Sequence, residues 1–242
     1  MSTTTQPAST AVEQFARRQR TPLQRVQHLL HSHPAISPFL VLVVAFAAFS
    51  VINPRFASPN SLSLVVQQVA VVGALAVGQT LIILTAGIDL SVGAITILAM
   101  MLAAKLAEGA GLPGVAAIGV GVLVGTAAGL VNGLLVTRLK LPPFIVTLGT
   151  LSIFTAIGLL YSRGRSVQSV DLPGILNWTG ESFAVGRFRI TYGVVLVAVL
   201  YLVVGFALAN TAWGRHVYAV GDDREASRLA GIRVDRVLVS VY

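Results

Sequence analysis

The sequence contains no cysteine, which excludes disulfide bonds and thiolate metal sites. Charge is also scarce, because Asp, Glu, Lys and Arg make up 11% of the 242 residues, against about 25% in a typical soluble domain. Hydrophobic residues make up 55% of the chain, and the mean hydropathy is +0.82. A soluble domain of this composition could not cover its surface with polar groups, so we expect a lipid bilayer as the solvent. A soluble helical protein is a remote alternative.

Lysine is nearly absent, and neither Lys105 nor Lys140 follows a glycine. The ATP-binding P-loop requires Gly-Lys-[Ser/Thr], so this chain is predicted not to hydrolyse ATP by that route. The His-Glu-x-x-His zinc motif, the nucleophile elbow and paired catalytic carboxylates are missing as well. We therefore predict no enzyme, no metal site and no cofactor held by this chain itself.

Long apolar segments dominate what is present. A transmembrane helix needs about 20 apolar residues, and six segments reach or approach that length. A seventh begins near Val237 and stops at Tyr242, so we expect the sequence to be a fragment truncated within a helix. The predicted fold is an all-α, polytopic transmembrane bundle with about six complete spans, at residues 36–52, 62–86, 90–107, 113–136, 144–161 and 191–209.

The formal charge of +8 reflects basic residues at the ends of the apolar segments. That placement is typical of membrane topology and not of a nucleic-acid-binding face. Residues 1–35 form a polar, basic tail that we predict to be partly disordered and cytoplasmic, and we favour this over a metal site at its clustered histidines. With the tail inside, alternation places most of the 17 basic residues on the cytoplasmic side, although four arginines in the 162–190 loop oppose this bias.

Four glycines recur at strict four-residue spacing on one face of the fourth segment. A helix face without side chains lets a neighbouring helix approach closely in a membrane. The face is either a static packing surface or a moving interface, and the sequence leaves both readings open. The residues are Gly121, Gly125, Gly129 and Gly133.

The break between the second and third segments carries a carboxylate, Asp89, which is costly in hydrocarbon. We favour Asp89 as the N-cap of the third helix, with Gly87 ending the second, over a place in a solute pathway. Uncharged hydrogen-bonding side chains also lie within the apolar helices, where they either bind a hydroxylated solute or join helices. The candidate pathway residues are thus Gln67, Gln68, Gln79, Asp89 and Asn132.

A polar stretch at 213–232 predicts a short helix of about two turns, too short to be stable alone. Asp222 and Glu225 have capping-box spacing, and Gly231 suits the C′ position. The helix either lies on its own membrane domain or docks into another subunit and transmits its motion.

These stretches resemble the permease subunits of bacterial ATP-binding cassette importers for monosaccharides, of the ribose/xylose/galactose type. The likeness runs from about residue 36 to the end, and fructose-import permeases are the nearest in pattern through 28–32 and 212–223. Its most recognisable parts are GQTLIILTAGIDLSVG at 78–93, Asn132-Gly133, LPPFIVTLG at 141–149 and the stretch 211–232.

The resemblance implies a cytoplasmic coupling region at 210–236 within an incomplete permease domain at 36–242. Its Glu-Ala-Ser…Gly run stands where importers carry Glu-Ala-Ala…Gly, with serine at the third place. The residues expected to couple to the ATPase are Asp222, Asp223, Glu225, Ala226, Ser227 and Gly231.

The resemblance also implies the partners. Two permease copies would form the pathway in the lipid of the bacterial inner membrane, with the N-terminus cytoplasmic and no nucleic acid involved. Separate cytoplasmic ATP-binding subunits would carry Mg-ATP, and a periplasmic sugar-binding protein would meet the 162–190 loop, whose basic residues are Arg163, Arg165, Arg187 and Arg189.

The rival class is a stand-alone secondary transporter or channel for a small polar solute. Such a protein needs ionisable groups at mid-membrane depth, and Asp89 is the one acid deep enough to consider.

Overall fold

The computed structural model describes residues 35–242, so the predicted cytoplasmic tail, with its arginines and histidines, lies outside the described residues. The chain divides into two compact units, residues 1–58 and 59–242. The described part of the first unit is helix α3, Ile36–Ile52, and the turn that follows it. Phe46 and Phe49 pack on Phe56 of that turn, with ring centroids 5.6 and 5.5 Å apart.

Five helices of the second unit are long and apolar enough to cross a membrane, while α3, with 17 residues, is shorter. Their ends lie within a few residues of the predicted segments. The result confirms the prediction of a polytopic helical membrane protein. The five are α4 (Pro59–Leu84), α5 (Val92–Ala110), α6 (Gly114–Thr137), α7 (Pro143–Ser162) and α9 (Tyr192–Asn210).

The segment between α7 and α9 is structured, which the sequence analysis did not predict. It contains η1 (Ser169–Asp171), α8 (Gly174–Asn177), η2 (Trp178–Gly180) and a hairpin of strands β1 (Ser182–Val185) and β2 (Phe188–Thr191). The strands are antiparallel, with Ser182 opposite Thr191. The backbone N–H of Arg189 donates to Ser63 Oγ at 2.9 Å, which attaches the hairpin to the first turns of α4.

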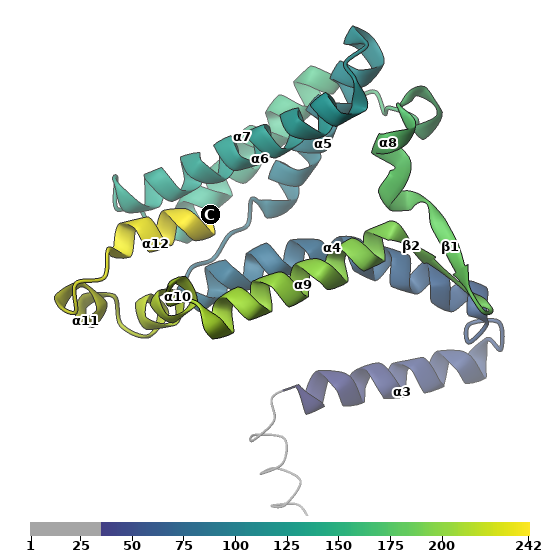
Figure 1. The fold of residues 1–242 in the computed structure, drawn as a ribbon, viewed down its shortest axis with the longest axis horizontal. Coiled ribbons are helices and arrows are strands. Elements are labelled where there is room, and N and C mark those ends of the chain that lie inside the picture. The colour runs from purple at the N-terminus through teal and green to yellow at the C-terminus, as the bar shows by residue number, and fades with distance from the viewer. Residues whose placement is uncertain (1–34) are drawn as a thin grey trace, which may run out of the picture. The chain divides into compact units, whose positions relative to one another are not determined.

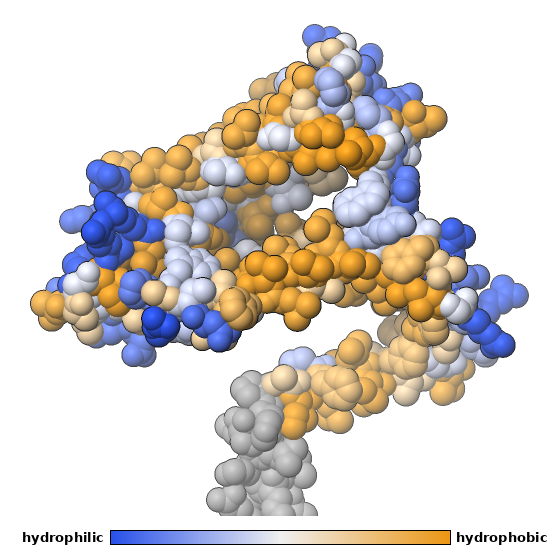
Figure 2. Space-filling model, in the orientation of Figure 1, coloured by the Kyte–Doolittle hydropathy of each residue, from blue (hydrophilic) through white to orange (hydrophobic). Residues whose placement is uncertain are grey.

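The second unit has two layers, one of α4 and α9 and the other of α5, α6 and α7 (Figure 1). Three shorter helices follow α9, namely α10 (Ala212–Asp222), α11 (Arg224–Leu229) and α12 (Val234–Val241). The last helix therefore begins three residues before the predicted start at Val237. In Figure 2 the long helices of this unit are largely hydrophobic, and hydrophilic residues gather at its two ends. A broad exposed apolar surface between polar ends is the pattern expected of helices that face lipid.

Buried side chains form three small clusters instead of one large core. Two of them join α5 to α6, and one of these two also includes Phe154 of α7. Their buried residues are mostly alanine, so these helices pack closely. The third joins the C-terminal turn of α4 to α10 and α12, through Ile82, Val217, Val220 and Leu238. This third cluster holds α10 and α12 against the end of α4, next to the break between α4 and α5.

Candidate functional site

The break between α4 and α5 begins with a compact turn. The Ala86 N–H donates to the Ile83 carbonyl and the Gly87 N–H to the Ile82 carbonyl, both at 2.9 Å, which is the Schellman pattern. The left-handed residue is Ala86, at φ +56°, so the prediction that Gly87 ends α4 is wrong by one position. Gly87 has another reason to be glycine, because a Cβ there would lie 2.9 Å from Ile82 Cγ2.

Asp89 is buried, with 6% of its surface exposed. Its Oδ1 accepts hydrogen bonds from the Ser91 N–H at 2.6 Å and from Ser91 Oγ at 2.7 Å. The N-cap of α5 is Ser91, so the prediction that Asp89 itself occupies the cap is wrong. Asp89 acts two residues earlier, in the i to i+2 turn that aspartate side chains favour, and it supports the capping residue.

Ser91 connects this turn to the neighbouring helices. Asn132 Nδ2 of α6 donates to Ser91 Oγ at 2.8 Å, and Thr147 Oγ1 of α7 shares its one hydrogen between the Pro143 carbonyl of its own helix at 2.9 Å and the Ile88 carbonyl at 3.2 Å. We call Asp89, Ser91, Asn132 and Thr147 the buried polar cluster. All four are at most 6% exposed, so their hydrogen bonds form where water competes little.

The predicted pathway residues are only partly brought together. Asp89 and Asn132 both bind Ser91, which the sequence analysis did not select. Gln67 and Gln68 lie on α4, the second of them exposed, and Gln79 Oε1 is buried without a hydrogen-bond partner among the described residues. Within the described part of the chain, no hydrogen bond joins these glutamines to the buried polar cluster.

The coupling region contains two helices, where the sequence analysis predicted one. Asp223 is the N-cap of α11, and its Oδ1 accepts from the backbone N–H groups of Glu225 at 2.8 Å and Ala226 at 3.0 Å. The predicted capping box of Asp222 and Glu225 is therefore wrong, because Asp222 is the last residue of α10 and its backbone belongs to that helix.

The predicted stop at Gly231 agrees with the structure. Gly231 has φ +84° and donates to the Arg228 carbonyl at 3.0 Å, while Ile232 donates to the Ser227 carbonyl at 3.0 Å. This is the complete Schellman motif.

The residues of α11 divide into those that shape it and those that face outward. Ser227 is buried, while Ala226 and Glu225 are exposed, and Glu225 Oε2 lies 3.5 Å from Arg228 Nη1. Leu229 is 83% exposed, which is unusual for a leucine on a polar helix and was missed by the sequence analysis. The sequence does contain a pattern that indicates this exposure, because Leu229 lies four residues after Glu225 and so shares its helix face.

Helices α10 and α11 contact the break directly. Arg224 Nη2 donates to the Thr85 carbonyl at 3.0 Å. Gly221 of α10 packs so close to the Leu84 carbonyl oxygen that a Cβ at position 221 would overlap it. The end of α4 and the α10–α11 pair therefore move together or lose these contacts.

The glycine face of α6 meets two neighbours and not one. Gly129 and Gly133 pack on α12 and its last residues, where Val239 Cα is 3.2 Å from a Cβ placed on Gly133. A Cβ placed on Gly121 would lie 3.5 Å from Ala103 Cβ of α5, an ordinary contact, and one placed on Gly125 would meet no described atom of another helix within 4 Å. The half of the face formed by Gly129 and Gly133 is therefore tightly packed, and the half formed by Gly121 and Gly125 is more open.

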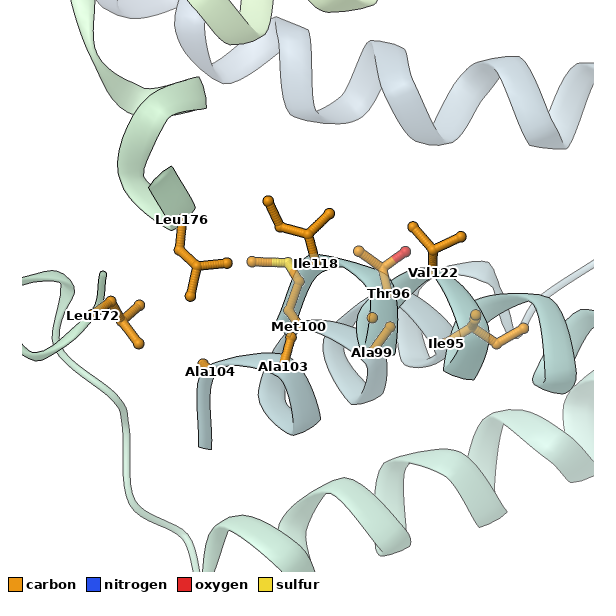
Figure 3. Close-up of a pocket in the computed structure, with 12 residues that line it drawn as sticks. Ile95, Thr96, Ala99, Met100, Ala103, Ala104, Ile118, Val122, Leu172 and Leu176 are labelled. Atoms are coloured by element: carbon orange, nitrogen blue, oxygen red, sulfur yellow. The ribbon is translucent and has the colours of Figure 1, made fainter. Parts of the chain in front are cut away.

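The open half borders a pocket of about 420 Å³ between α5 and α6. In Figure 3 side chains of both helices line it, together with Leu172 and Leu176. Its one polar lining side chain, Thr96, already donates to the Val92 carbonyl at 2.9 Å. A hydroxylated solute needs several directed polar groups, so this lining suits an apolar occupant.

The sequence is similar to those of known import permease proteins. The chain is 46% identical to a fructose import permease protein of Rhizobium meliloti, over 97% of this chain and 66% of that protein. It is 35% identical to a ribose import permease protein of Bacillus subtilis, over 86% and 63%, and 32% identical to an autoinducer 2 import system permease protein of Photorhabdus luminescens, over 88% and 63%. The chain thus spans slightly less than two thirds of the length of these relatives. No solved structure matches it.

The sequence profile described as the permease component of the branched-chain amino acid transport system matches residues 61–242. That range includes α4 from its third residue, the other four long helices, the break with its buried polar cluster, and helices α10 to α12. The chain therefore belongs to this family of membrane transport permeases.

Proposed function

We propose that this chain is the permease subunit of an ATP-binding cassette importer that carries a monosaccharide, a pentose or a hexose such as fructose, across the bacterial inner membrane. The relatives named for fructose and ribose import support the substrate class. The observation that carries the proposal is the direct packing of the α10–α11 pair on the end of α4. An importer whose energy comes from separate ATP-binding subunits needs such a contact to pass their motion to the membrane helices.

In this mechanism the chain performs no covalent chemistry and is not an enzyme. Cytoplasmic ATP-binding subunits hold Mg-ATP and dock on α11, where Glu225, Ala226 and Leu229 are exposed. An exposed leucine next to a charged residue is the composition expected of a docking surface. Closure of the ATPase pair moves α10 and α11, and the membrane helices change between inward-open and outward-open arrangements.

The opposite end of the second unit suits a periplasmic sugar-binding protein. The exposed residues Arg163, Arg165 and Arg187 lie in the loop and hairpin between α7 and α9 (Figure 1). The Arg189 side chain already makes a hydrogen bond within the hairpin, because its Nε donates to Ser182 Oγ at 3.1 Å. Basic residues on this face would attract acidic residues of the binding protein. In the proposed orientation α10–α12 and the N-terminus lie in the cytoplasm, and a second permease copy completes the pathway.

Reconstitution into proteoliposomes tests the proposal. The full-length permease, its ATPase subunits and its binding protein should take up radiolabelled sugar only when ATP is present on the ATPase side. Competition among unlabelled fructose, ribose and other monosaccharides then identifies the sugar. Uptake by the permease without ATPase subunits would refute the proposal and favour a stand-alone transporter or channel.

A further inference from the structure

Four helices meet at the short segment 85–91. Arg224 of α11 contacts it at the Thr85 carbonyl, and Gly221 of α10 packs just before it, against Leu84. Asn132 of α6 and Thr147 of α7 contact it from the other layer. Segment 85–91 therefore lies between two groups of helices. It connects α10 and α11 on one side with α6 and α7 on the other through a small number of contacts.

The contact of Arg224 with Thr85 is well placed to transmit force. The carbonyls in the last turn of a helix have no partner within the helix, and a cation is favourable at that end. Thr85 is fully buried, and Arg224 is half-buried. A hydrogen bond from a charged donor to a buried carbonyl is stronger than one between neutral groups in water.

The segment between Thr85 and Ser91 has little freedom to absorb a displacement. Ala86 and Gly87 are held by the turn that ends α4, and the Ile88 carbonyl accepts from Thr147. Asp89 and Ser91 complete the path to Asn132, with each hydrogen bond between 2.6 and 2.8 Å long. A shift at the Thr85 carbonyl therefore reaches α6 through the buried hydrogen bonds of Asp89, Ser91 and Asn132, and reaches α7 through the partly buried contact of Thr147 with Ile88.

We propose that Arg224 is a positioning residue that couples the α10–α11 pair to the buried polar cluster, so that movement of the coupling helices changes how α6 and α7 pack. The proposal rests on the importer function for its role in transport. The mechanical connection itself is a property of the chain and is measured separately.

The first test measures amide hydrogen exchange of segment 85–91 in the full-length permease in lipid nanodiscs, without partners. Arg224→Gln removes the charge and should speed exchange in this segment by about tenfold, equivalent to about 1.4 kcal/mol. The control is Arg236→Gln, an exposed arginine on α12, which should leave exchange unchanged. Unchanged exchange in Arg224→Gln would overturn the connection, whatever the protein transports.

The second test uses the assembled transporter and compares sugar uptake with ATP hydrolysis. Arg224→Gln should retain its ATPase subunits and hydrolyse ATP, while sugar taken up per ATP falls by about tenfold, the fold-change expected from exchange. Arg224→Lys keeps the cation at the end of α4 and should restore most of the uptake. Wild-type uptake in Arg224→Gln, or loss of the ATPase subunits from it, would contradict a positioning role.

A conformational readout separates positioning from simple stability. These 242 residues contain no cysteine, so Thr150→Cys adds a thiol to α7 at a position that is 4% exposed, and the transporter without this substitution gives the background labelling. Its maleimide labelling in the transporter should change when ATP and vanadate trap the ATPase subunits, and Arg224→Gln should abolish that change. If the change persists in Arg224→Gln, the inference fails. If the wild-type complex shows neither ATP-dependent uptake nor ATPase binding, the importer function fails, and the exchange test still decides the connection.

Discussion

The contact between α10 and the end of α4 leaves no room for a side chain at Gly221, and this permits a quantitative prediction. A Cβ at this position would overlap the Leu84 carbonyl oxygen and lie 3.3 Å from Thr85 Cα. Ordinary contact needs about 3.5 Å, so Gly221→Ala must push α10 away by roughly 1 Å or more. A shift of that size takes Arg224 Nη2, now 3.0 Å from the Thr85 carbonyl, out of hydrogen-bond range.

Overpacking of this kind costs about 1–3 kcal/mol. At about 2–4 °C per kcal/mol for a chain of this size, Gly221→Ala should lower the melting temperature by about 2–12 °C. The measurement is thermal unfolding of the detergent-purified permease, followed by circular dichroism.

The matched control is Gly119→Ala on α6, where no described atom lies within 4 Å of the added Cβ. This exposed helix position should gain up to about 1 kcal/mol, because alanine is the better helix former. A melting temperature for Gly221→Ala equal to that of the wild type would refute the close approach of α10 to α4.

Substitutions at three further positions examine the same region. Ala86→Gly relieves a left-handed alanine at φ +56° and should stabilise the protein by about 1 kcal/mol, read as a rise in melting temperature; a fall would contradict the turn described here. Asp89→Asn retains an acceptor for the Ser91 N–H and should change the free energy of unfolding little. Asp89→Ala leaves this buried donor unpaired and should lower the free energy of unfolding by about 1–3 kcal/mol, measured by chemical denaturation. Equal losses in the two variants would count against the turn. Glu225→Arg changes a side chain that is 73% exposed, so folded yield should be unchanged while co-purification with the ATPase subunits falls, and unaltered co-purification would exclude Glu225 from the docking surface.

Local sequence rules described much of the coupling region but misplaced its cap. Asp222 and Asp223 are adjacent, and either can supply a capping carboxylate. The choice depends on where α10 ends, and the burial of Val217 and Val220 against α4 holds α10 in helical geometry as far as Asp222. Gly231 could be assigned from sequence, because its left-handed backbone is a local requirement that glycine meets best.

At the break at 85–91, too, the sequence predicted some features and packing decided others. A carboxylate between two apolar segments marked it as unusual, and this needed no structure. The role of Ser91 could not be deduced, because its partner Asn132 is 41 residues away and the hydrogen bond exists only once α5 and α6 are packed. The glycine face of α6 likewise predicted close packing but not that Gly121 and Gly133 would meet different helices.

The sequence alone determined the helical membrane fold, the approximate spans, the polar breaks and the family, because all of these follow from composition, segment length and local pattern. The tertiary structure decided which residues work together. Three contacts join residues that are distant in sequence. They are the hydrogen bond of Arg224 to Thr85, the close approach of Gly221 to Leu84, and the hydrogen bond of Asn132 to Ser91, which Asp89 also binds within its local turn. Such contacts depend on how helices pack, and packing in a membrane is set by close fit and hydrogen bonding, which no single segment encodes.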